Sequence, residues 1–325
     1  MLKYLSRILF IFLIIGAMAV FNVKTISAAQ GGARPISMGG AFVALADDAH
    51  ASTWNPAGLA WQKDHELAVS GIINGRNDYI TGDFISDDYI AYTQKLGQGK
   101  ESANGTIGAY FLNCTYENNT TRSTTTLWQP GIAYGRQFGF DENKAWGVSL
   151  NYFNFESKIP GISSSDTAIS LNAGFLWNLT DKVALGLLIE NINEPTFTIH
   201  GVNNRLIRVW RPGLAYYFDE STVFTFDIYD LTGNTKDSGS DFSKNARFGM
   251  EHYFTPDLSL RLGAHQPNSN VDSSKFYSLG LGWQYSEFFI SHPVCYYLDY
   301  TFIYWQDAIE GNDDYLHQFG VSCKF

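Results

Sequence analysis

The C-terminal residues 315–325 read YLHQFGVSCKF, and hydrophobic and polar side chains alternate along most of this stretch. One face carries Tyr315, Phe319, Val321, Cys323 and Phe325, and the other carries Gln318, Gly320, Ser322 and Lys324. Only Leu316 and His317 break the rule. A period of two residues predicts a β-strand with one apolar and one polar face.

The same alternation recurs through the chain between turn-rich breaks such as Thr255-Pro256-Asp257. Longer polar stretches, which we expect to be loops, lie at 118–126, 157–167, 233–244 and 267–275. The pattern predicts 14 strands, at 66–72, 87–95, 105–114, 127–138, 144–154, 168–178, 182–191, 207–218, 221–231, 244–254, 257–266, 275–286, 295–305 and 314–325. An even number of strands is typical of single-chain bacterial outer-membrane barrels.

A secreted β-sandwich or repeat protein also alternates, so three further features decide in favour of a transmembrane antiparallel β-barrel. The apolar faces approach the 9–11 residues of a membrane strand, with aromatic residues near the strand ends. The polar faces are rich in Gly and Ser, which suits a lumen. The chain ends on Phe325, which resembles the C-terminal signal that the barrel assembly machinery recognises. The expected surroundings are therefore outer-membrane lipid.

The amino-acid composition excludes several classes of protein. The 325 residues are 16% aromatic and 17% charged, with a net charge of −10. The aromatic content excludes disorder, and the acidic balance argues against a nucleic-acid partner. Three cysteines exclude a disulfide scaffold, and a single long apolar run excludes a multi-helix membrane protein.

That apolar run is part of an expected export signal. Lys3 and Arg7 precede the apolar residues 8–20, and the small residues Ser27-Ala28-Ala29 follow. This order predicts a cleaved signal peptide over residues 1–29, with an uncleaved anchor as the alternative. We expect export to the bacterial outer membrane.

The following stretch, GGARPISMGGAFVALADDAHASTWNPAGLA at 31–60, does not alternate. Its apolar residues Phe42, Leu45, Ala46 and Ala49 have helical spacing, bounded by Gly39-Gly40 and Asn55-Pro56. The sequence predicts a helix here, within a compact element of residues 30–62 that has the right size to fold inward as a plug. Residues 63–325 would form the barrel.

At these residues the chain resembles the outer-membrane long-chain fatty acid transporter (FadL-like) superfamily, including its PorV/PorQ-type branch. The matching pattern is GGARPISMGGA at 31–41, ALADDA at 44–49 and WNPAGL at 54–59; beyond it the resemblance is architectural only. The resemblance implies a 14-stranded barrel whose N-terminal segment is a hatch. The hatch residues are then Gly39, Gly40, Trp54, Asn55, Pro56, Ala57 and Gly58.

Such families take up small hydrophobic ligands from outside, often releasing them through a gap in the wall. The leading hypothesis is therefore passive uptake of hydrophobic, fatty-acid-like compounds gated by the hatch. The alternative is a PorV/PorQ-type barrel that is a partner in protein secretion or surface attachment, and a third is a structural barrel whose plug never moves. No ligand-binding residue can be carried over.

Several polar residues admit two interpretations. Asn55 and Pro56 either link the hatch to a ligand or form a plain turn. Asp47-Asp48 is expected to pair with lumen arginines, Arg247 or Arg261, rather than to bind a cation. The alternation also assigns four carboxylates to the lumen faces of the strands: Glu190, Asp227, Glu251 and Asp299.

One short motif occurs twice, as WQPGIAY at 128–134 and WRPGLAY at 210–216. Because proline cannot donate to a ladder, Pro130 and Pro212 should mark strand starts or bulges. We favour two equivalent hairpin entries at one rim over a break in the wall that would let a ligand leave sideways.

Enzyme motifs are absent from the sequence, and no catalytic residue, metal site or cofactor is predicted. Residues 97–101, GQGKE, lack the spacer and the Ser/Thr of a phosphate loop. Cys114, Cys295 and Cys323 are expected to be wall residues. A barrel lipase with a Ser/His pair from separate strands stays an alternative.

Overall fold

The computed structural model describes residues 31–72, 88–97, 104–118, 122–139, 142–233, 246–266, 275–289, 292–309 and 312–325. The expected signal peptide, residues 1–29, lies outside this part of the chain, as do most of the polar stretches at 233–244 and 267–275. Among the described residues, no helix combines the length and the apolar character needed to cross a membrane.

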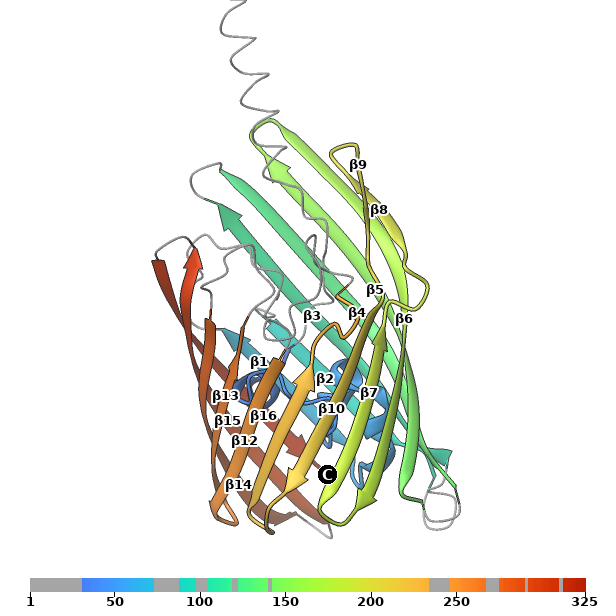
Figure 1. The fold of residues 1–325 in the computed structure, drawn as a ribbon, viewed down its shortest axis with the longest axis vertical. Coiled ribbons are helices and arrows are strands. Elements are labelled where there is room, and N and C mark those ends of the chain that lie inside the picture. Colours follow the sequence, from blue (N-terminus) through green and yellow to red (C-terminus); the bar gives the residue numbers. More distant parts are fainter. Residues whose placement is uncertain are drawn as a thin grey trace, which may run out of the picture.

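Fourteen strands form a closed antiparallel barrel, in the order β1-β16-β15-β14-β13-β12-β11-β10-β7-β6-β5-β4-β3-β2, as the sequence predicted (Figure 1). The first and last strands close it, with Val69 opposite Val321. The barrel strands are β1 (Glu66–Ile72), β2 (Asp88–Lys95), β3 (Thr106–Asn118), β4 (Ser123–Phe138), β5 (Lys144–Ile159), β6 (Ile162–Thr180), β7 (Val183–Glu190), β10 (Val209–Tyr217), β11 (Thr222–Ile228), β12 (Ala246–Thr255), β13 (Leu258–His265), β14 (Lys275–Phe289), β15 (His292–Ile309) and β16 (Asn312–Lys324).

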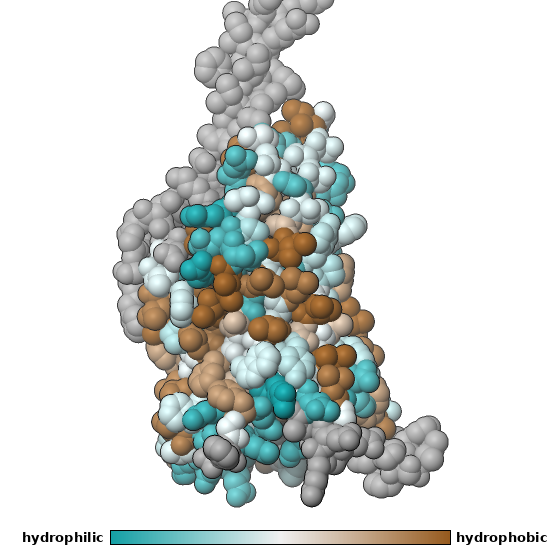
Figure 2. All heavy atoms as spheres, turned by 90° about the vertical axis from the view of Figure 1, so that its right-hand side faces the viewer, coloured by the Kyte–Doolittle hydropathy of each residue, from teal (hydrophilic) through white to brown (hydrophobic). Residues whose placement is uncertain are grey.

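The two faces of each strand differ as the alternation predicted. On β5 the outward residues Trp146, Val148 and Leu150 are exposed, whereas Ser149 and Asn151 are buried in the lumen. Apolar side chains gather across the middle of the face seen in Figure 2, with polar side chains towards its lower rim. An apolar outer band around a closed barrel is the architecture of a transmembrane β-barrel.

The wall is uneven in height. Strands β3 to β6, which we call the tall wall, have 13, 16, 16 and 19 residues, and they rise above the rest (Figure 1). Strands β10 to β13, the short wall, have 9, 7, 10 and 8 residues. The prediction of loops at 118–126 and 157–167 was therefore wrong over most of both stretches. Ser and Thr residues continue the ladders there, up to a tight turn at Gly161 (φ 80°).

A small hairpin between β7 and β10 was not predicted. It is formed by β8 (Thr196–Ile199) and β9 (Val202–Arg205). It leans on the tall wall, where Phe197 stacks on Phe155 with ring centroids 3.9 Å apart. The Thr198 amide donates to Asp166 Oδ2 over 2.6 Å.

The helix expected over residues 42–49 is absent. The structure has instead α2 (Ala33–Ser37), α3 (Ala51–Trp54) and the 3-10 helix η1 (Pro56–Trp61), joined by turns. The amides of Phe42 and Val43 donate to Asp227 Oδ2, at 2.8 and 2.9 Å, and the Ala49 amide donates to Glu66 Oε2. Bonds to the wall thus replace the helical ladder.

Both prolines of the repeated motif lie within strands, so the prediction of strand starts or bulges was wrong. Pro130 is in the middle of β4, on its outer face, where the pairing with β5 passes from Trp128–Asn154 to Gly131–Asn151 without a change of register. Pro212 follows Arg211 in β10 and keeps its place opposite β7.

Candidate functional site

The N-terminal segment, residues 31–62, contacts the inner face of the barrel along its course (Figure 1). Ten glycines on ten strands face it, and a methyl group on any of them would meet or press on atoms of the segment or of lumen side chains. These glycines, which we call the glycine band, are Gly108, Gly135, Gly147, Gly174, Gly186, Gly213, Gly249, Gly263, Gly280 and Gly320. The Gly-rich polar faces noted in the sequence therefore make room for this segment.

The closest fit lies where residues 55–57 meet β5 and β6. A methyl group on Gly174 would overlap Asn55 Oδ1, and one on Gly147 would overlap the backbone of Pro56 and Ala57. Since an added atom would displace the Asn55 side chain at Gly174 and the backbone of the segment at Gly147, this part of the segment is held closely against the wall.

Asn55 is fully buried and makes bonds both within the segment and to the barrel. Its Nδ2 donates to Val43 O at 2.8 Å and to Phe175 O at 3.3 Å, while its Oδ1 accepts from the Ala57 amide at 3.2 Å. Pro56 is the first residue of η1, where the missing amide hydrogen costs nothing.

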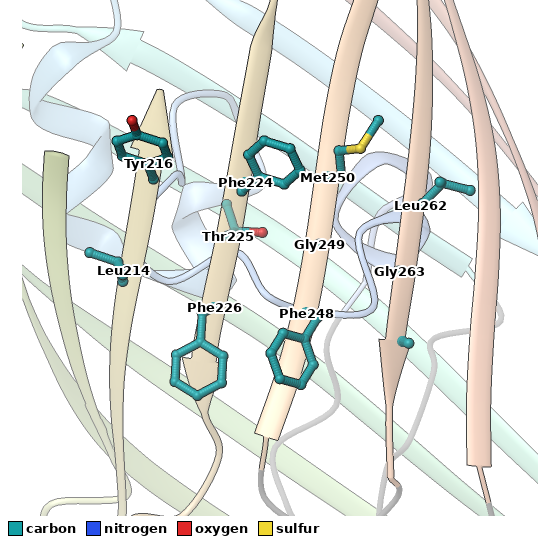
Figure 3. Close-up of a pocket in the computed structure, with 11 residues that line it drawn as sticks. Leu214, Tyr216, Phe224, Thr225, Phe226, Phe248, Gly249, Met250, Leu262 and Gly263 are labelled. Atoms are coloured by element: carbon teal, nitrogen blue, oxygen red, sulfur yellow. The ribbon is translucent and has the colours of Figure 1, made fainter. Parts of the chain in front are cut away.

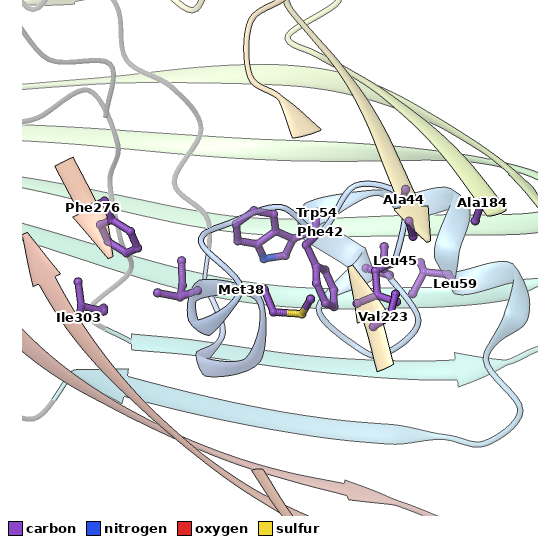
Figure 4. Packing of buried hydrophobic residues seen from close by; sticks show 14 of the residues in the cluster. Met38, Phe42, Ala44, Leu45, Trp54, Leu59, Ala184, Val223, Phe276 and Ile303 are labelled. Atoms are coloured by element: carbon purple, nitrogen blue, oxygen red, sulfur yellow. The ribbon is translucent and has the colours of Figure 1, made fainter. Parts of the chain in front are cut away.

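Of the other residues singled out by the resemblance, Trp54 lies in a buried apolar cluster with Met38 and Phe42 (Figure 4), and Ala57 packs in a separate cluster with Ala145 and Leu176. Trp54 is fully buried, donates from Nε1 to Gly31 O at 2.9 Å, and packs edge to face with Phe42. Gly40 has a φ of 69° and lies against Trp54, and Gly39 has a φ of 64°, a region that favours glycine. A methyl group on Gly58 would overlap a backbone carbonyl of the segment itself.

Arg34, which the sequence analysis did not single out, is the partner of the adjacent aspartates. Its Nη1 donates to Asp47 Oδ1 at 2.5 Å and to Asp48 Oδ2 at 2.7 Å. Its other edge forms a two-pronged pair with Glu251, at 3.0 and 2.7 Å. The expected pairing of Asp47-Asp48 with Arg247 or Arg261 was thus wrong. Both aspartates bind Arg34, which belongs to the same N-terminal segment. Arg34 is the one Arg or Lys within the quoted stretch 31–60, a signal that could have identified it.

The carboxylates on the lumen faces of the strands are buried as predicted, and several of them lie next to an arginine. Arg261 donates to Glu251 at 2.6 Å and to Asp299 at 2.5 Å. Arg211, with no exposed surface, lies 3.5 Å from Glu190.

His50 and Asp48 form a further pair inside the segment. His50 Nδ1 lies 2.9 Å from Asp48 Oδ1, and the His50 ring stacks on Tyr89. Burial raises the pKa of Asp48, but the charges of His50 and Arg34 outweigh it and hold that pKa well below its usual range. Burial lowers the pKa of His50, but the Asp48 carboxylate outweighs it, so that the pKa lies above its ordinary value.

Above the segment, the inner face of the tall wall carries a group of apolar side chains, with the buried polar residues Gln129 and Ser157 among them. Buried side chains there form one cluster with the β8–β9 hairpin. We call the following residues the lumen patch: Leu112, Cys114, Leu127, Phe153, Phe155, Ala168, Phe197 and Leu206. The same cluster includes Ala49 of the N-terminal segment. Sequence reasoning missed the patch, although Phe153 and Phe155 continue the inward series of Ser149 and Asn151 at a period of two.

Two hollows among the described residues lie on the outer face, away from the lumen. One, of about 380 Å³, is bordered by Phe224, Phe226, Phe248 and Leu262 of the short wall (Figure 3). The other, of about 370 Å³, includes Ile132 and Leu150 of the tall wall. Both are lined by side chains of the outer apolar band, which lipid contacts in a membrane barrel. No group of three or more His, Cys, Asp or Glu with metal-binding geometry occurs among the described residues.

Comparison with solved structures reveals which barrels share this arrangement. A FadL homologue of Pseudomonas aeruginosa matches 93% of this chain and 99% of its own, with a TM-score of 0.58 and 11% sequence identity. The two chains share this fold. The toluene transporter TbuX of Ralstonia pickettii gives a TM-score of 0.57 at 11% identity, covering 94% and 99% of the two chains. The toluene transporter TodX of P. putida gives 0.54 at 14% identity, covering 93% and 98%. No family model and no curated protein sequence matches the chain.

Proposed function

We propose that this chain is a FadL-like outer-membrane protein through which hydrophobic compounds enter passively, and that it is not an enzyme. The observation that carries the proposal is the lumen patch: buried apolar side chains on the inner face of the tall wall, directly above the N-terminal segment. A lumen that only passed polar solutes would be lined by polar residues at this height, as in porins. A compound with a large, fatty-acid-like apolar body would bind there by leaving water.

We further propose that the N-terminal segment is the hatch of this passage. The support is that Ala49 belongs to the same cluster as the lumen patch, while Asp48 and His50 on either side hold the turn by polar contacts. Residues 55–57 fit closely against Gly147 and Gly174. The turn at 47–51 is therefore the part that a bound ligand would displace, and Asn55 the part that stays.

The remaining elements of the proposal concern delivery. Residues 1–29 would direct export and be removed, and the barrel assembly machinery would recognise Phe325. Phe325 follows the last residue of β16, and its backbone exchanges two hydrogen bonds of 3.0 Å with His65.

The test is uptake of an apolar fluorescent probe, N-phenyl-1-naphthylamine, by bacteria with an intact outer membrane that express the full chain. We expect several-fold faster uptake than in cells without the protein, and a loss of that gain in Phe155→Gln. The control Phe218→Gln makes the same change at the exposed turn between β10 and β11 and should retain uptake. A folded wild-type barrel in the outer membrane that does not accelerate uptake would contradict the proposal.

A second role, as a PorV/PorQ-type partner in secretion, is favoured by one observation. The tall wall and the β8–β9 hairpin form a projecting surface at one end of the barrel (Figure 1). Native mass spectrometry of protein extracted in mild detergent separates the roles. A stoichiometric small hydrophobe, lost on replacing residues 55–57, supports uptake; a co-released protein without a small ligand supports secretion.

A further inference from the structure

The lumen carries many charges, and their pairing bears on the head group that a ligand could have. Four basic side chains of the described lumen lie within 4 Å of carboxylates of the same chain: Arg34, Arg211, Arg261 and Lys324. Arg34 and Arg261 each contact more than one carboxylate and share Glu251. These cations are already neutralised before any ligand arrives.

Arg211 shows how little of such a cation is accessible. Its guanidinium lies 5.5 Å from the ring centre of Trp54 and 5.0 Å from that of Tyr229, while Nη1 faces Glu190. Arg211 has no exposed surface, and Glu190 is 1% exposed. A ligand carboxylate could reach this arginine only by displacing groups that cover it, the glutamate among them.

Around the N-terminal segment, the described carboxylates also outnumber the basic groups. The carboxylates are Asp47, Asp48, Glu66, Glu190, Asp227, Glu251 and Asp299. The basic groups are Arg34, His50, Arg211, Arg247, Arg261 and Lys324. A further carboxylate entering this region would lose its water and meet net negative charge, and both effects oppose it.

The lumen patch offers no compensation, because its members are Leu, Phe, Ala and Cys side chains. An uncharged apolar compound loses nothing there, whereas an anion would have to leave its charge in water or in the acidic region below. A compound that contacts both the lumen patch and the acidic region around the N-terminal segment is therefore selected by its charge as well as by its hydrophobicity.

We propose that the passage admits uncharged apolar compounds and rejects carboxylates, so that free fatty acid anions are not its substrates. This inference rests on the proposed uptake function and narrows it to one ligand class. Glu190 is then a specificity-determining residue, since it keeps Arg211 from attracting an anion.

The test compares benzyl alcohol with benzoate, which share the ring and differ in charge. Their binding to the full-length protein in lipid nanodiscs is measured by calorimetry at pH 7.5, with empty nanodiscs as the blank. We expect benzyl alcohol to bind at least about tenfold more tightly than benzoate. Equal or tighter benzoate binding would overturn the inference. If neither compound binds above the blank, the proposed function itself fails.

A charge-removing variant examines the cause. In Glu190→Gln, Arg211 loses its carboxylate partner, so the preference for benzyl alcohol should shrink several-fold because benzoate binding improves. Asp299→Asn, which removes one of two partners of Arg261, should act in the same direction and replaces the first variant if that one fails to fold. Glu220→Gln, at an exposed turn, is the matched control with an unchanged preference. An unchanged preference in a folded Glu190→Gln protein would show that charge pairing does not set selectivity.

Discussion

The tall wall and the short wall of this barrel have similar outer faces and opposite inner ones. Outside, both carry exposed apolar residues, such as Leu150 on β5 and Leu262 on β13, because both face the same bilayer. Inside, the upper part of the tall wall carries the apolar lumen patch, and the short wall holds buried charges such as Arg211 and Glu251. The outer face is thus set by the membrane, and the inner face by what lies against it.

The difference follows the N-terminal segment. Where the segment occupies the lumen, its free amides and Arg34 need partners, and Asp227 and Glu251 of the short wall supply them. Where the tall wall rises above the segment, no such need exists, and its inner face carries Phe153 and Phe155. Buried charge therefore serves to hold the segment, and under the proposed function the lumen patch is the apolar surface that a ligand would contact.

The largest effect is expected from breaking the charged side of this comparison. In Glu251→Gln, Arg34 and Arg261 lose the buried carboxylate that bridges them, and only Asp47, Asp48 and Asp299 remain as their ion-pair partners. The barrel should lose about 3–5 kcal/mol of its unfolding free energy, measured by denaturant titration in detergent. Glu156→Gln removes the partner of Lys158 on an exposed part of the tall wall and should cost under about 1 kcal/mol. Equal losses in both variants would show that the charges of the short wall do not hold the segment.

A smaller effect is expected from filling the glycine band. Gly174→Ala places a methyl group onto Asn55 Oδ1, so the segment must shift, at a cost of about 1–3 kcal/mol. Gly320→Ala makes the same change where the nearest atom, Ala33 Cβ, is 3.1 Å away, so a shift of a few tenths of an ångström is enough. Limited proteolysis within residues 31–62, together with thermal melting, distinguishes the two. Greater sensitivity in Gly320→Ala than in Gly174→Ala would contradict the close fit at Asn55.

The sequence predicted the barrel far better than it predicted the interior. Strand number and facing follow from a period of two, which is local and repeats fourteen times, so each strand supports the others. The inner contacts depend on which distant strand lies opposite, and no local pattern encodes that. Helical spacing at Phe42, Leu45 and Ala49 was misleading because Asp227 and Glu66, far along the chain, take the backbone amides. Arg34 and the lumen patch were missed for a simpler reason. Each stands out as a local exception in the sequence: Arg34 as a charge in a stretch poor in basic residues, and Phe153 and Phe155 as apolar residues on an otherwise polar strand face.

On the tall wall, the next effect concerns the hairpin that closes the lumen patch. Phe197→Leu keeps an apolar side chain but removes the stack on Phe155, at a cost of about 0.5–1.5 kcal/mol. We expect faster amide hydrogen exchange in residues 196–205 and little change in the short wall. Phe248→Leu, on the outer face of the short wall, is the matched control and should leave that exchange unaltered. Unchanged exchange in Phe197→Leu would mean that the stack does not hold the hairpin on the tall wall.

The smallest effect is expected at the pair of His50 and Asp48. This pair lies beside Ala49, where the charged contacts of the N-terminal segment meet the lumen patch. The pKa of His50 is raised in the folded protein, so its contribution is complete below the unfolded value of about 6.5 and is lost as pH rises through the folded pKa. The pKa of Asp48 is lowered, so its contribution is present above about 3.9 and is lost as pH falls through the folded pKa. The pair should therefore stabilise most between about pH 4 and 6.5.

Melting temperatures of the wild type and His50→Gln, measured from pH 5 to 9, test this window. The wild-type advantage should be largest at the acidic end and should shrink above about pH 6.5 as His50 loses its proton. Asp48→Asn removes the cause of the raised pKa, so the histidine should no longer stabilise the fold at acidic pH. Arg34, Glu66 and Tyr89 surround the pair and remain in both variants, and the charge of Glu66 acts on His50 as well. A wild-type advantage that grows with pH would mean that the turn at 47–51 is held by the neutral histidine, and the charged contacts would then not be what a ligand must displace.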